Sequence, residues 1–197
     1  MNNHIYILIG FEESQAITTE LRKRGFSAFS CDIEDCSGDM PEYHLKMDIF
    51  QAIALRKWDM IILHPSCTYT ALCGNRWYWN SQDRKDGIQL CKSAWDSACN
   101  VCEHVMLEQP KTIMQRYIGK RSQTIQPWQF GHGETKETWF WLKNLPKLEP
   151  TNIVEGREPR IWKMPPSKDR QKLRSKTYPG IAKAIACQWG KYIIENE

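Results

Sequence analysis

The feature that most constrains the fold is an alternation of short apolar segments with amphipathic segments along the chain. Five apolar segments have the length and composition of buried strands, at residues 4–9, 26–33, 58–65, 104–110 and 137–142. The amphipathic segments that predict helices lie at residues 13–24, 83–103 and 179–193. Strands that alternate with helices predict an α/β domain built on a mainly parallel sheet.

The predicted strands end at polar or reactive residues. The chain leaves four of them at Gly10–Ser14, Cys31–Asp35, His64–Thr68 and Glu108–Pro110. In an open parallel sheet the carboxyl ends of the strands meet at one edge, and ligands bind in the crevice beyond them. We therefore expect the functional site at this edge.

Length and composition are those of a globular protein. The chain has 197 residues, of which 25% are charged, and this length predicts one domain over residues 1–197. Neither a secretory signal nor an apolar run of membrane-spanning length is evident. We therefore expect a cytoplasmic protein that has free thiols and no membrane partner.

Positive charge gathers in a loop-rich segment over residues 146–178. Its basic residues include Lys163, Lys168, Arg170, Lys172, Arg174 and Lys176. Such a segment either contacts phosphates or forms a solvated surface loop. The net charge of +4 permits contact with nucleic acid without requiring it.

Tryptophan and cysteine are frequent, with nine and eight residues. Several tryptophans lie near turn signals, where they either stack on bases or cover the core: Trp77, Trp79, Trp128, Trp139 and Trp141. Cys99, Cys102 and His104 resemble half of a zinc site. A second ligand pair with matching spacing is not evident, so we expect no metal.

Two aspartates are candidates for holding an adenosyl cofactor. Asp32 ends the second predicted strand, where an acidic residue commonly binds ribose hydroxyls, and Glu34 and Asp35 compete for this role. Asp48, in a short segment at residues 44–50, could accept a hydrogen bond from an adenine amino group. Each aspartate could instead cap a loop.

The loop after the first strand contains Gly10 followed by Phe11, Glu12, Glu13 and Ser14. Nucleotide-binding turns usually carry two or three glycines, so that the backbone can approach the ligand. Two adjacent carboxylates would repel a pyrophosphate, but they tolerate a cationic sulfonium. The loop therefore argues against a dinucleotide and leaves room for S-adenosylmethionine.

Cys67 lies on the turn that follows the strand at residues 58–65. It could be a nucleophile, a metal ligand or a small buried hydrophobic residue. Pro65 fixes the turn, and Glu108 ends a strand that we expect nearby. A thiolate that attacks a ring and a carboxyl group that hydrogen-bonds the same ring form a workable pair. Combined with Asp32 and Asp48, this pairing favours Cys67 as the reactive residue.

These residues resemble the cytosine-5 DNA methyltransferases. The proline-cysteine motif of that family is similar to HPSCT (64–68), and its Glu-Asn-Val motif is similar to LEQP (107–110). Its Gln-x-Arg-x-Arg motif is loosely echoed at Lys136 and Thr138, and its last motif looks like YPGIAKAIACQWG. The whole chain more closely resembles small phage and prophage proteins labelled DNA methyltransferases, through HPSCTY (64–69), QPWQFG (126–131) and LRSKTYPGIA (173–182).

The resemblance implies a class I methyltransferase-like, Rossmann-like fold: a doubly wound, mainly parallel sheet with helices on both faces. It implies that Cys67 adds to carbon 6 of a cytosine in DNA, that Glu108 holds the ring, and that S-adenosylmethionine supplies a methyl group to carbon 5. The cofactor would be contacted by Gly10, Phe11, Glu12, Ser14, Asp32, Asp48 and Pro65. The flipped-out base and its strand would be contacted by Arg76, Trp77, Lys136, Arg174, Lys176 and Tyr178.

The resemblance also implies a phage- or prophage-encoded protein in a bacterial host. Residues 146–172 are too few for the target-recognition domain that the family usually carries, so we expect a short DNA context or a protein partner that supplies specificity. Two other functions stay open. One is a non-catalytic phage protein that binds nucleic acid, a nucleotide or a host factor; the other is an enzyme that modifies the base of a free pyrimidine nucleotide.

Overall fold

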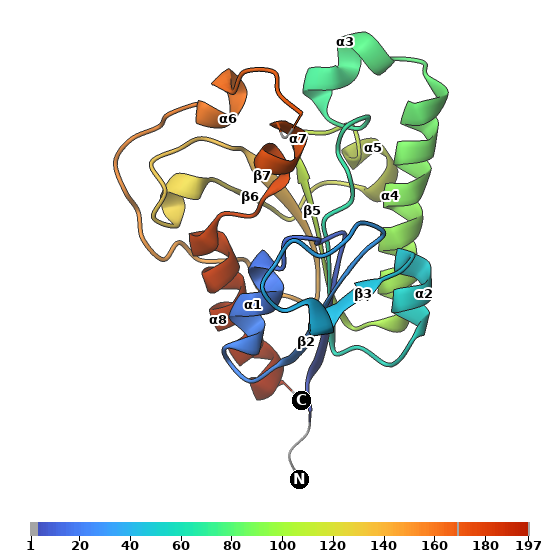
Figure 1. Ribbon diagram of the computed structural model, residues 1–197, viewed down its shortest axis with the longest axis vertical. Helices are drawn as coiled ribbons and strands as arrows, with labels where there is room; N and C mark the ends of the chain where they lie inside the picture. The colour runs from blue at the N-terminus through green and yellow to red at the C-terminus, as the bar shows by residue number, and fades with distance from the viewer. Residues whose placement is uncertain (1–3, 169, 197) are drawn as a thin grey trace.

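A computed structural model describes residues 4–168 and 170–196, and a seven-stranded sheet organises them (Figure 1). The order of the strands across the sheet is β3-β2-β1-β4-β5-β7-β6. Their bounds are Tyr6–Gly10 for β1, Ser27–Asp32 for β2, His44–Lys46 for β3, Met60–Leu63 for β4, His104–Pro110 for β5, Gln123–Ile125 for β6 and Thr138–Lys143 for β7.

The sheet is mainly parallel, as predicted. Strands β1 to β5 pair in parallel, whereas β7 runs antiparallel to both β5 and β6. The carboxyl ends of β1, β2, β4 and β5 therefore lie at one edge of the sheet. All four strand exits with polar or reactive residues meet there, which confirms the expected clustering.

Helices cover both faces of the sheet, so the predicted doubly wound arrangement is confirmed. Helices α1 (Ala16–Arg22) and α8 (Pro179–Glu195) pack on one face, and α2 (Ile49–Ala54) and α4 (Gln82–Val101) pack on the other (Figure 1). The alternation along β1 explains the two layers, because Ile7 and Ile9 belong to one core cluster and Leu8 belongs to the other.

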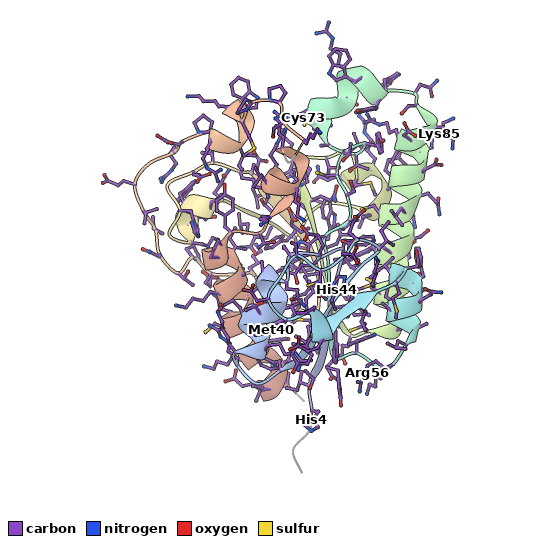
Figure 2. All side chains as sticks on the ribbon, viewed as in Figure 1. His4, Met40, His44, Arg56, Cys73 and Lys85 are labelled. Atoms are coloured by element: carbon purple, nitrogen blue, oxygen red, sulfur yellow. The ribbon has the colours of Figure 1, made fainter. Side chains whose placement is uncertain are left out.

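Several short helices gather at the carboxyl edge of the sheet, at the upper end of Figure 1. These are α3 (Asn75–Tyr78), α6 (Arg160–Lys163) and α7 (Arg170–Ser175), with α5 (Gln115–Ile118) beside α4. Cys73 marks this end in Figure 2, whereas His4 and Arg56 mark the opposite end. The segment predicted to be loop-rich thus contains two short helices.

The first helix starts later than the predicted residue 13 because the loop before it is tightly turned. Phe11 and Gln15 have φ angles of 61° and 55°, in the left-handed region. The carboxylate of Glu12 accepts hydrogen bonds from the backbone N–H groups of Ile17 (2.7 Å) and Thr18 (3.3 Å), and so fixes the start of α1. Gly25, at φ 86°, follows α1 in the position predicted for it.

The tryptophans divide into buried and exposed rings. Trp139 and Trp141 lie on β7 with 3% exposure each, so they cover the core. Trp77 and Trp79 are 75% and 68% exposed at α3. Trp128 lies under the guanidinium group of Arg157, 3.9 Å from the ring centroid. Within the part of the chain that the structure describes, no helix is long and apolar enough to cross a membrane.

Candidate active site

The register between β4 and β5 places His64 beside Glu108. Leu63 pairs with Leu107 across the two strands, so the residues that follow them, His64 and Glu108, lie at the same level of the sheet. Nδ1 of His64 lies 3.0 Å from Oε2 of Glu108, and the two side chains are only 11% and 17% exposed. The backbone N–H of His64 also donates to the carbonyl of Gly10, which ties this position to β1.

The loop that carries Cys67 is fastened to the end of β5 by Gln109. This buried amide donates through Nε2 to the carbonyl of Pro65 and accepts through Oε1 from the hydroxyl of Thr70 at 2.8 Å. The carbonyl of Cys67 then accepts from the backbone N–H groups of Thr70 (3.2 Å) and Ala71 (2.9 Å). The cysteine is therefore held on a fixed turn.

The thiol of Cys67 is partly buried and lies within electrostatic reach of Glu108. Burial is the main reason that its pKa rises to about 11, and the negative charge of Glu108 adds to the rise. The ammonium group of Lys136 acts in the opposite direction. In the free protein at neutral pH, Cys67 is therefore a neutral thiol.

Glu108 titrates in the other direction although it is buried. Burial favours the protonated acid, but the hydrogen bond from His64 and the positive charge of Lys136 outweigh it. The pKa of Glu108 is therefore held below its usual range, and the group is a carboxylate at neutral pH.

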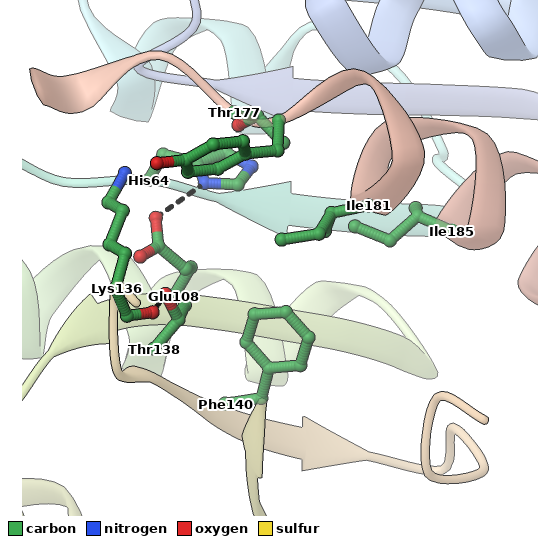
Figure 3. A pocket seen from close by; sticks show the side chains of 9 residues that line it. His64, Glu108, Lys136, Thr138, Phe140, Thr177, Ile181 and Ile185 are labelled. Carbon is green, nitrogen blue, oxygen red and sulfur yellow. Dashed lines mark hydrogen bonds and ion pairs between the residues drawn. The ribbon is translucent and has the colours of Figure 1, made fainter. Parts of the chain in front are cut away.

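A small pocket lies beside His64 and Glu108, as Figure 3 shows. Its volume of about 20 Å³ accommodates a water-sized molecule. Glu108, His64 and Lys136 form its polar side, whereas Phe140, Ile181 and Ile185 form an apolar side. Thr138, Thr177 and Tyr178 complete its lining. Cys67 lies on the neighbouring loop and is not one of the lining residues, so a base that reaches both the pocket and the thiol requires the site to open.

The far wall of the pocket comes from the C-terminal third of the chain. The hydroxyl of Tyr178 donates to Glu134 at 2.6 Å, and Nε of Arg160 donates to the other carboxylate oxygen at 2.9 Å. Burial and this carboxylate raise the pKa of Tyr178. Nζ of Lys136 donates to the carbonyl of Lys176 at 3.4 Å. These contacts join the loop before β7 to α6 and to the start of α8.

Two of the motifs that carried the resemblance pack against each other in this wall. The QPWQFG turn contains Phe130, whose carbonyl oxygen would lie 1.9 Å from a Cβ placed on Gly180 of the LRSKTYPGIA segment. The backbone N–H of Gly180 donates to Nε2 of His132 at 3.0 Å. Glycine is required at residue 180 because the two backbones approach so closely.

The predicted cofactor residues surround the exits of β1 and β2. Asp32 ends β2, is partly exposed and accepts from the backbone N–H of Glu34 at 3.1 Å. Asp48 caps α2 by accepting from the backbone N–H of Phe50 at 2.8 Å, and it remains exposed. The predicted capping role of Asp48 is thus observed, and one carboxylate oxygen of each aspartate is left for a ligand.

Glu12 is placed differently from the expectation. It is 5% exposed, and it accepts from the hydroxyl of Thr18 at 2.7 Å in addition to the two backbone N–H groups at the start of α1. Burial raises its pKa, although these hydrogen bonds oppose the rise. We therefore assign Glu12 to the scaffold of the loop and leave cofactor contacts to its neighbours.

The remaining predicted cofactor residues lie along the same edge. Gly10 ends β1, where a Cβ would lie 2.4 Å from Cδ1 of Ile49, so the glycine permits close packing. Phe11 packs at the border of the core cluster, and Ser14 is partly buried. Pro65 is buried, with its carbonyl held by Gln109.

The donor set at this edge fits S-adenosylmethionine. Free carboxylate oxygens at Asp32 and Asp48 can accept from ribose hydroxyls and an amino group. The carboxylate of Glu13 already accepts from the hydroxyl of Ser37 and lies 3.5 Å from Nζ of Lys172, so it is not free for a cation. Such carboxylates are unfavourable neighbours for a pyrophosphate.

The residues predicted to bind nucleic acid fall into two groups. Arg76 and Trp77 lie exposed on α3, and Arg174 and Lys176 lie on or directly after α7, which all belong to the carboxyl edge. Lys136 and Tyr178 instead line the pocket, close to Glu108.

The zinc-like spacing has a different structural explanation. Nζ of Lys143 donates to the backbone carbonyls of Cys99 (2.7 Å) and Cys102 (2.8 Å) at the C-terminus of α4. Both cysteines are free thiols. Within residues 4–168 and 170–196, no group of three or more His, Cys, Asp or Glu side chains is arranged to hold a metal ion.

Sequence reasoning did not assign roles to His64 or Gln109, although both shape the site. A signal for His64 is present in the sequence, because the apolar runs before His64 and Glu108 end at equivalent positions of neighbouring strands. The link from Gln109 to Pro65 depends on the path of the loop, and no local pattern reports that path.

Comparison with known proteins identifies the fold. No family model matches the chain, and neither does any curated protein. A solved structure described as a DNA modification methyltransferase encoded within a prophage (E. coli) gives a TM-score of 0.53 at 13% identity, over 77% of this chain and 52% of that chain. The S. pombe Dnmt2 methyltransferase gives 0.51 at 12% identity, over 81% and 54%.

A third structure, the Entamoeba histolytica methyltransferase EhMeth, gives a TM-score of 0.51 at 11% identity, over 78% of this chain and 58% of that chain. With the sheet order and the helices on both faces, these likenesses show that the chain has the Rossmann-like fold of class I methyltransferases. The chain spans about half the length of the solved structures that it matches.

Proposed function

We propose that this protein is an S-adenosylmethionine-dependent methyltransferase that acts on carbon 5 of cytosine in DNA, with Cys67 as the nucleophile. The observation that carries the proposal is the position of Cys67 and Glu108 at the carboxyl ends of adjacent strands in a methyltransferase fold. The reaction needs a thiolate and a carboxyl group on the same ring, and the charge of Glu108 raises the pKa of the Cys67 thiol.

In this reaction the sulfur of Cys67 forms a bond to carbon 6 of the cytosine, and the electron pair of the 5,6 double bond moves to carbon 5. Glu108 and Lys136 hold the polar edge of the ring while this charge develops. S-adenosylmethionine, when bound beside Asp32 and Asp48, would supply the methyl group that bonds to carbon 5 and would be left as a neutral thioether. A base then takes the proton from carbon 5, the sulfur–carbon 6 bond breaks, and the thiolate is released.

The neutral state of Cys67 has a consequence for this sequence of events. Because the pKa of the free thiol is about 11, the proton must leave when the substrate binds. The ammonium group of Lys136 favours the thiolate, whereas displacement of water by the entering base opposes it, so the thiol passes its proton to solvent as the sulfur attacks carbon 6. The chemistry is thereby coupled to substrate binding.

The carboxyl edge of the sheet provides a surface for the DNA strand. Trp77 and Trp79 on one side and Trp162 on the other are 75%, 68% and 77% exposed. Arg76 lies with the first pair, and Arg174 and Lys176 lie with the second group. Exposed aromatic rings stack on unpaired bases, and the cations contact phosphates.

The direct test is to incubate the protein with tritiated S-adenosylmethionine and a single-stranded or duplex cytosine oligonucleotide. We expect label on carbon 5 of cytosine, located by mass spectrometry after digestion, and none with Cys67→Ser. Cys187→Ser, which changes an exposed cysteine on α8, is the matched control. If calorimetry detects binding of neither the cofactor nor its demethylated product, the proposal fails.

A second candidate is methylation of a free pyrimidine nucleotide. The small pocket and the short helices α6 and α7, in place of a larger recognition domain, favour it. Deoxycytidine monophosphate in the same assay separates the two functions, because label on the nucleotide without label on DNA supports the second. Unlabelled products with intact nucleic-acid binding in Cys67→Ser would instead indicate a binding protein.

A further inference from the structure

The imidazole ring of His64 contacts the carboxylate of Glu108 and lies within electrostatic range of a second buried carboxyl group, that of Glu12. Nδ1 is 3.0 Å from Oε2 of Glu108 on β5. Glu12, from the loop after β1, interacts with His64 electrostatically, and the backbone N–H of His64 donates to the carbonyl of Gly10 at 3.0 Å. The other titratable groups near the pair are Lys136, before β7, and Cys67, on the same loop as the histidine. His64 therefore links the scaffold of the β1 loop to Glu108.

The geometry of this contact leaves one oxygen of Glu108 unused. His64 occupies Oε2, so Oε1 is left for a ligand, and Figure 3 shows Lys136 beside the same carboxylate. Within the described residues, Nε2 of His64 is buried and has no hydrogen-bond partner. Burial of a ring nitrogen without a hydrogen-bond partner destabilises the folded protein. Such unpaired groups are rare and call for a structural or functional explanation.

We propose that His64 is a positioning residue that fixes Glu108 as an anion, so that its free oxygen accepts a hydrogen bond from an amino group of the substrate base. The inference rests on the proposed function, because it concerns the base that enters the same pocket. Glu108 then supplies an acceptor and Lys136 supplies a donor. That pair complements cytosine, which presents an amino donor beside ring-nitrogen and carbonyl acceptors.

Uracil and thymine present a carbonyl oxygen where cytosine presents its amino group. That oxygen would face the carboxylate of Glu108 without a proton between them, and the buried acceptor would lose its partner. If Glu108 were free to become protonated, it could donate to the carbonyl oxygen and the discrimination would weaken. By holding Glu108 ionised, His64 makes the pocket selective for an amino-pyrimidine.

Binding to oligonucleotides tests the selectivity. A thymine oligonucleotide with one central cytosine is compared with the same strand carrying uracil at that place, and affinities are measured by fluorescence anisotropy. We expect the wild-type protein to prefer the cytosine strand by about tenfold or more, the value of one charged hydrogen bond. His64→Leu should reduce the preference to less than about threefold, and His64→Asn, which keeps a donor near the Nδ1 position, should retain part of it.

The matched control is His104→Leu, at the opposite end of β5. It removes a partly buried histidine without touching Glu108, and we expect it to leave the cytosine preference unchanged. The inference is overturned if His64→Leu keeps the preference for cytosine over uracil. It is also overturned if the wild-type protein shows no such preference with either oligonucleotides or nucleotides.

A second measurement does not depend on activity or on the folding of a variant at position 64. The ¹⁵N signals of the His64 ring in wild-type protein should show a proton on Nδ1, and Glu108→Gln should shift that signal. An unprotonated Nδ1, or an unchanged spectrum in Glu108→Gln, overturns the inference. Cytosine selectivity without methyl transfer would refute the proposed function alone, whereas methyl transfer with selectivity intact in His64→Leu would refute the inference alone.

Discussion

At the scale of single residues, the site combines two acidic groups, the thiol of Cys67 and the carboxyl group of Glu108. Burial raises the pKa of both, but their neighbours shift the two pKa values in opposite directions. Burial favours the neutral form of both Cys67 and Glu108. The hydrogen bond from His64 and the charge of Lys136 nevertheless lower the pKa of Glu108. The negative charge of Glu108 in turn raises the pKa of Cys67 further. Burial is therefore the main reason that Cys67 is a neutral thiol, and Glu108, the carboxylate that we propose holds the substrate base, adds to the effect.

The reactivity of Cys67 should follow this ionisation. Because burial and Glu108 raise the thiol pKa to about 11, only a small fraction is thiolate at neutral pH. We expect iodoacetamide to alkylate Cys67 slowly at pH 7 and the rate to increase with pH up to about 11, as followed by mass spectrometry of the peptide that contains Cys67.

Glu108→Gln provides the comparison for this measurement. It removes the negative charge that raises the thiol pKa, so the pH midpoint of alkylation should move to a lower value. The exposed thiol of Cys187 in the same sample reports reagent quality and protein integrity. Rapid modification of Cys67 in wild-type protein at pH 7 would contradict the expectation.

At the scale of elements, the start of α8 and the QPWQFG turn act as one unit. The turn presents the Phe130 carbonyl to Gly180, and His132 accepts the backbone N–H of the same glycine. Tyr178, directly before α8, reaches back to Glu134. Two sequence motifs separated by more than forty residues thus depend on each other's geometry.

Substitution of Gly180 should push the start of α8 away from the QPWQFG turn. In Gly180→Ala the added Cβ would lie 1.9 Å from the carbonyl oxygen of Phe130, so the backbones must move apart. We expect the free energy of unfolding to fall by about 2 kcal/mol or more in urea titrations. Lys183→Ala, at an exposed position of the same helix, should change it by less than about 0.5 kcal/mol. Equal stability in the two variants would show that the close approach is relieved without cost.

The exposed tryptophans at α3 and α6 should contribute to binding rather than to stability. Trp162→Ala and Trp77→Ala remove rings that are 77% and 75% exposed, so unfolding should change little. Binding of single-stranded DNA should weaken by about 1–3 kcal/mol in each case, the value of one base–aromatic stack. Tryptophan fluorescence quenching on addition of the oligonucleotide measures it.

Leu55→Ala is the control for the tryptophan variants. Leu55 is 57% exposed and follows α2, next to Arg56 at the opposite end of the molecule (Figure 2). Its loss should leave DNA affinity unchanged. If Leu55→Ala lost as much DNA affinity as the tryptophan variants, the loss would not be specific to the surface formed by α3 and α6.

At the scale of the whole molecule, the modest net charge of +4 conceals an uneven distribution. Helices α6 and α7 of the segment 146–178, which carry Lys163, Lys172 and Arg174, lie at the edge of the sheet where the strands end. The charge that attracts a phosphate chain and the groups that would modify its base thus occupy the same end of the molecule.

The salt dependence of DNA binding should report this distribution. Each phosphate contact on a single strand contributes about −0.7 to the slope of log K against log salt. Removal of two contacts in Lys163→Ala/Lys176→Ala should therefore reduce the magnitude of the slope by about 1.4. Lys57→Ala, exposed near Arg56, should leave it unchanged. A slope that is identical in all three proteins would exclude phosphate contacts by the segment.

Much of the fold could be predicted from the sequence because its strands and longer helices carry strong periodicity. The parallel core, the helices and the clustering of strand exits follow from apolar runs such as residues 58–65. The strand Gln123–Ile125 was missed because it is a short edge strand with two polar residues, and α2 was hidden behind its cap at Asp48.

The site was less predictable because its contacts depend on tertiary geometry. Tyr178 and Lys136 were predicted to contact nucleic acid, but their position beside Glu108 depends on the packing of α8 on the QPWQFG turn. Glu12 was expected at the cofactor, but the tight turn at Phe11 and Gln15 directs it to the start of α1. Neither outcome has a local signal in the sequence.

The origin of the pocket walls has a consequence for protein synthesis. Cys67 and Glu108 are both translated by residue 108, and their strands can pair as soon as they emerge from the ribosome. Lys136, Tyr178 and Ile185 are added much later, and α8 packs beside α1 from the beginning of the chain. A nascent chain can therefore pair the strands that carry Cys67 and Glu108 before it can enclose the pocket beside Glu108.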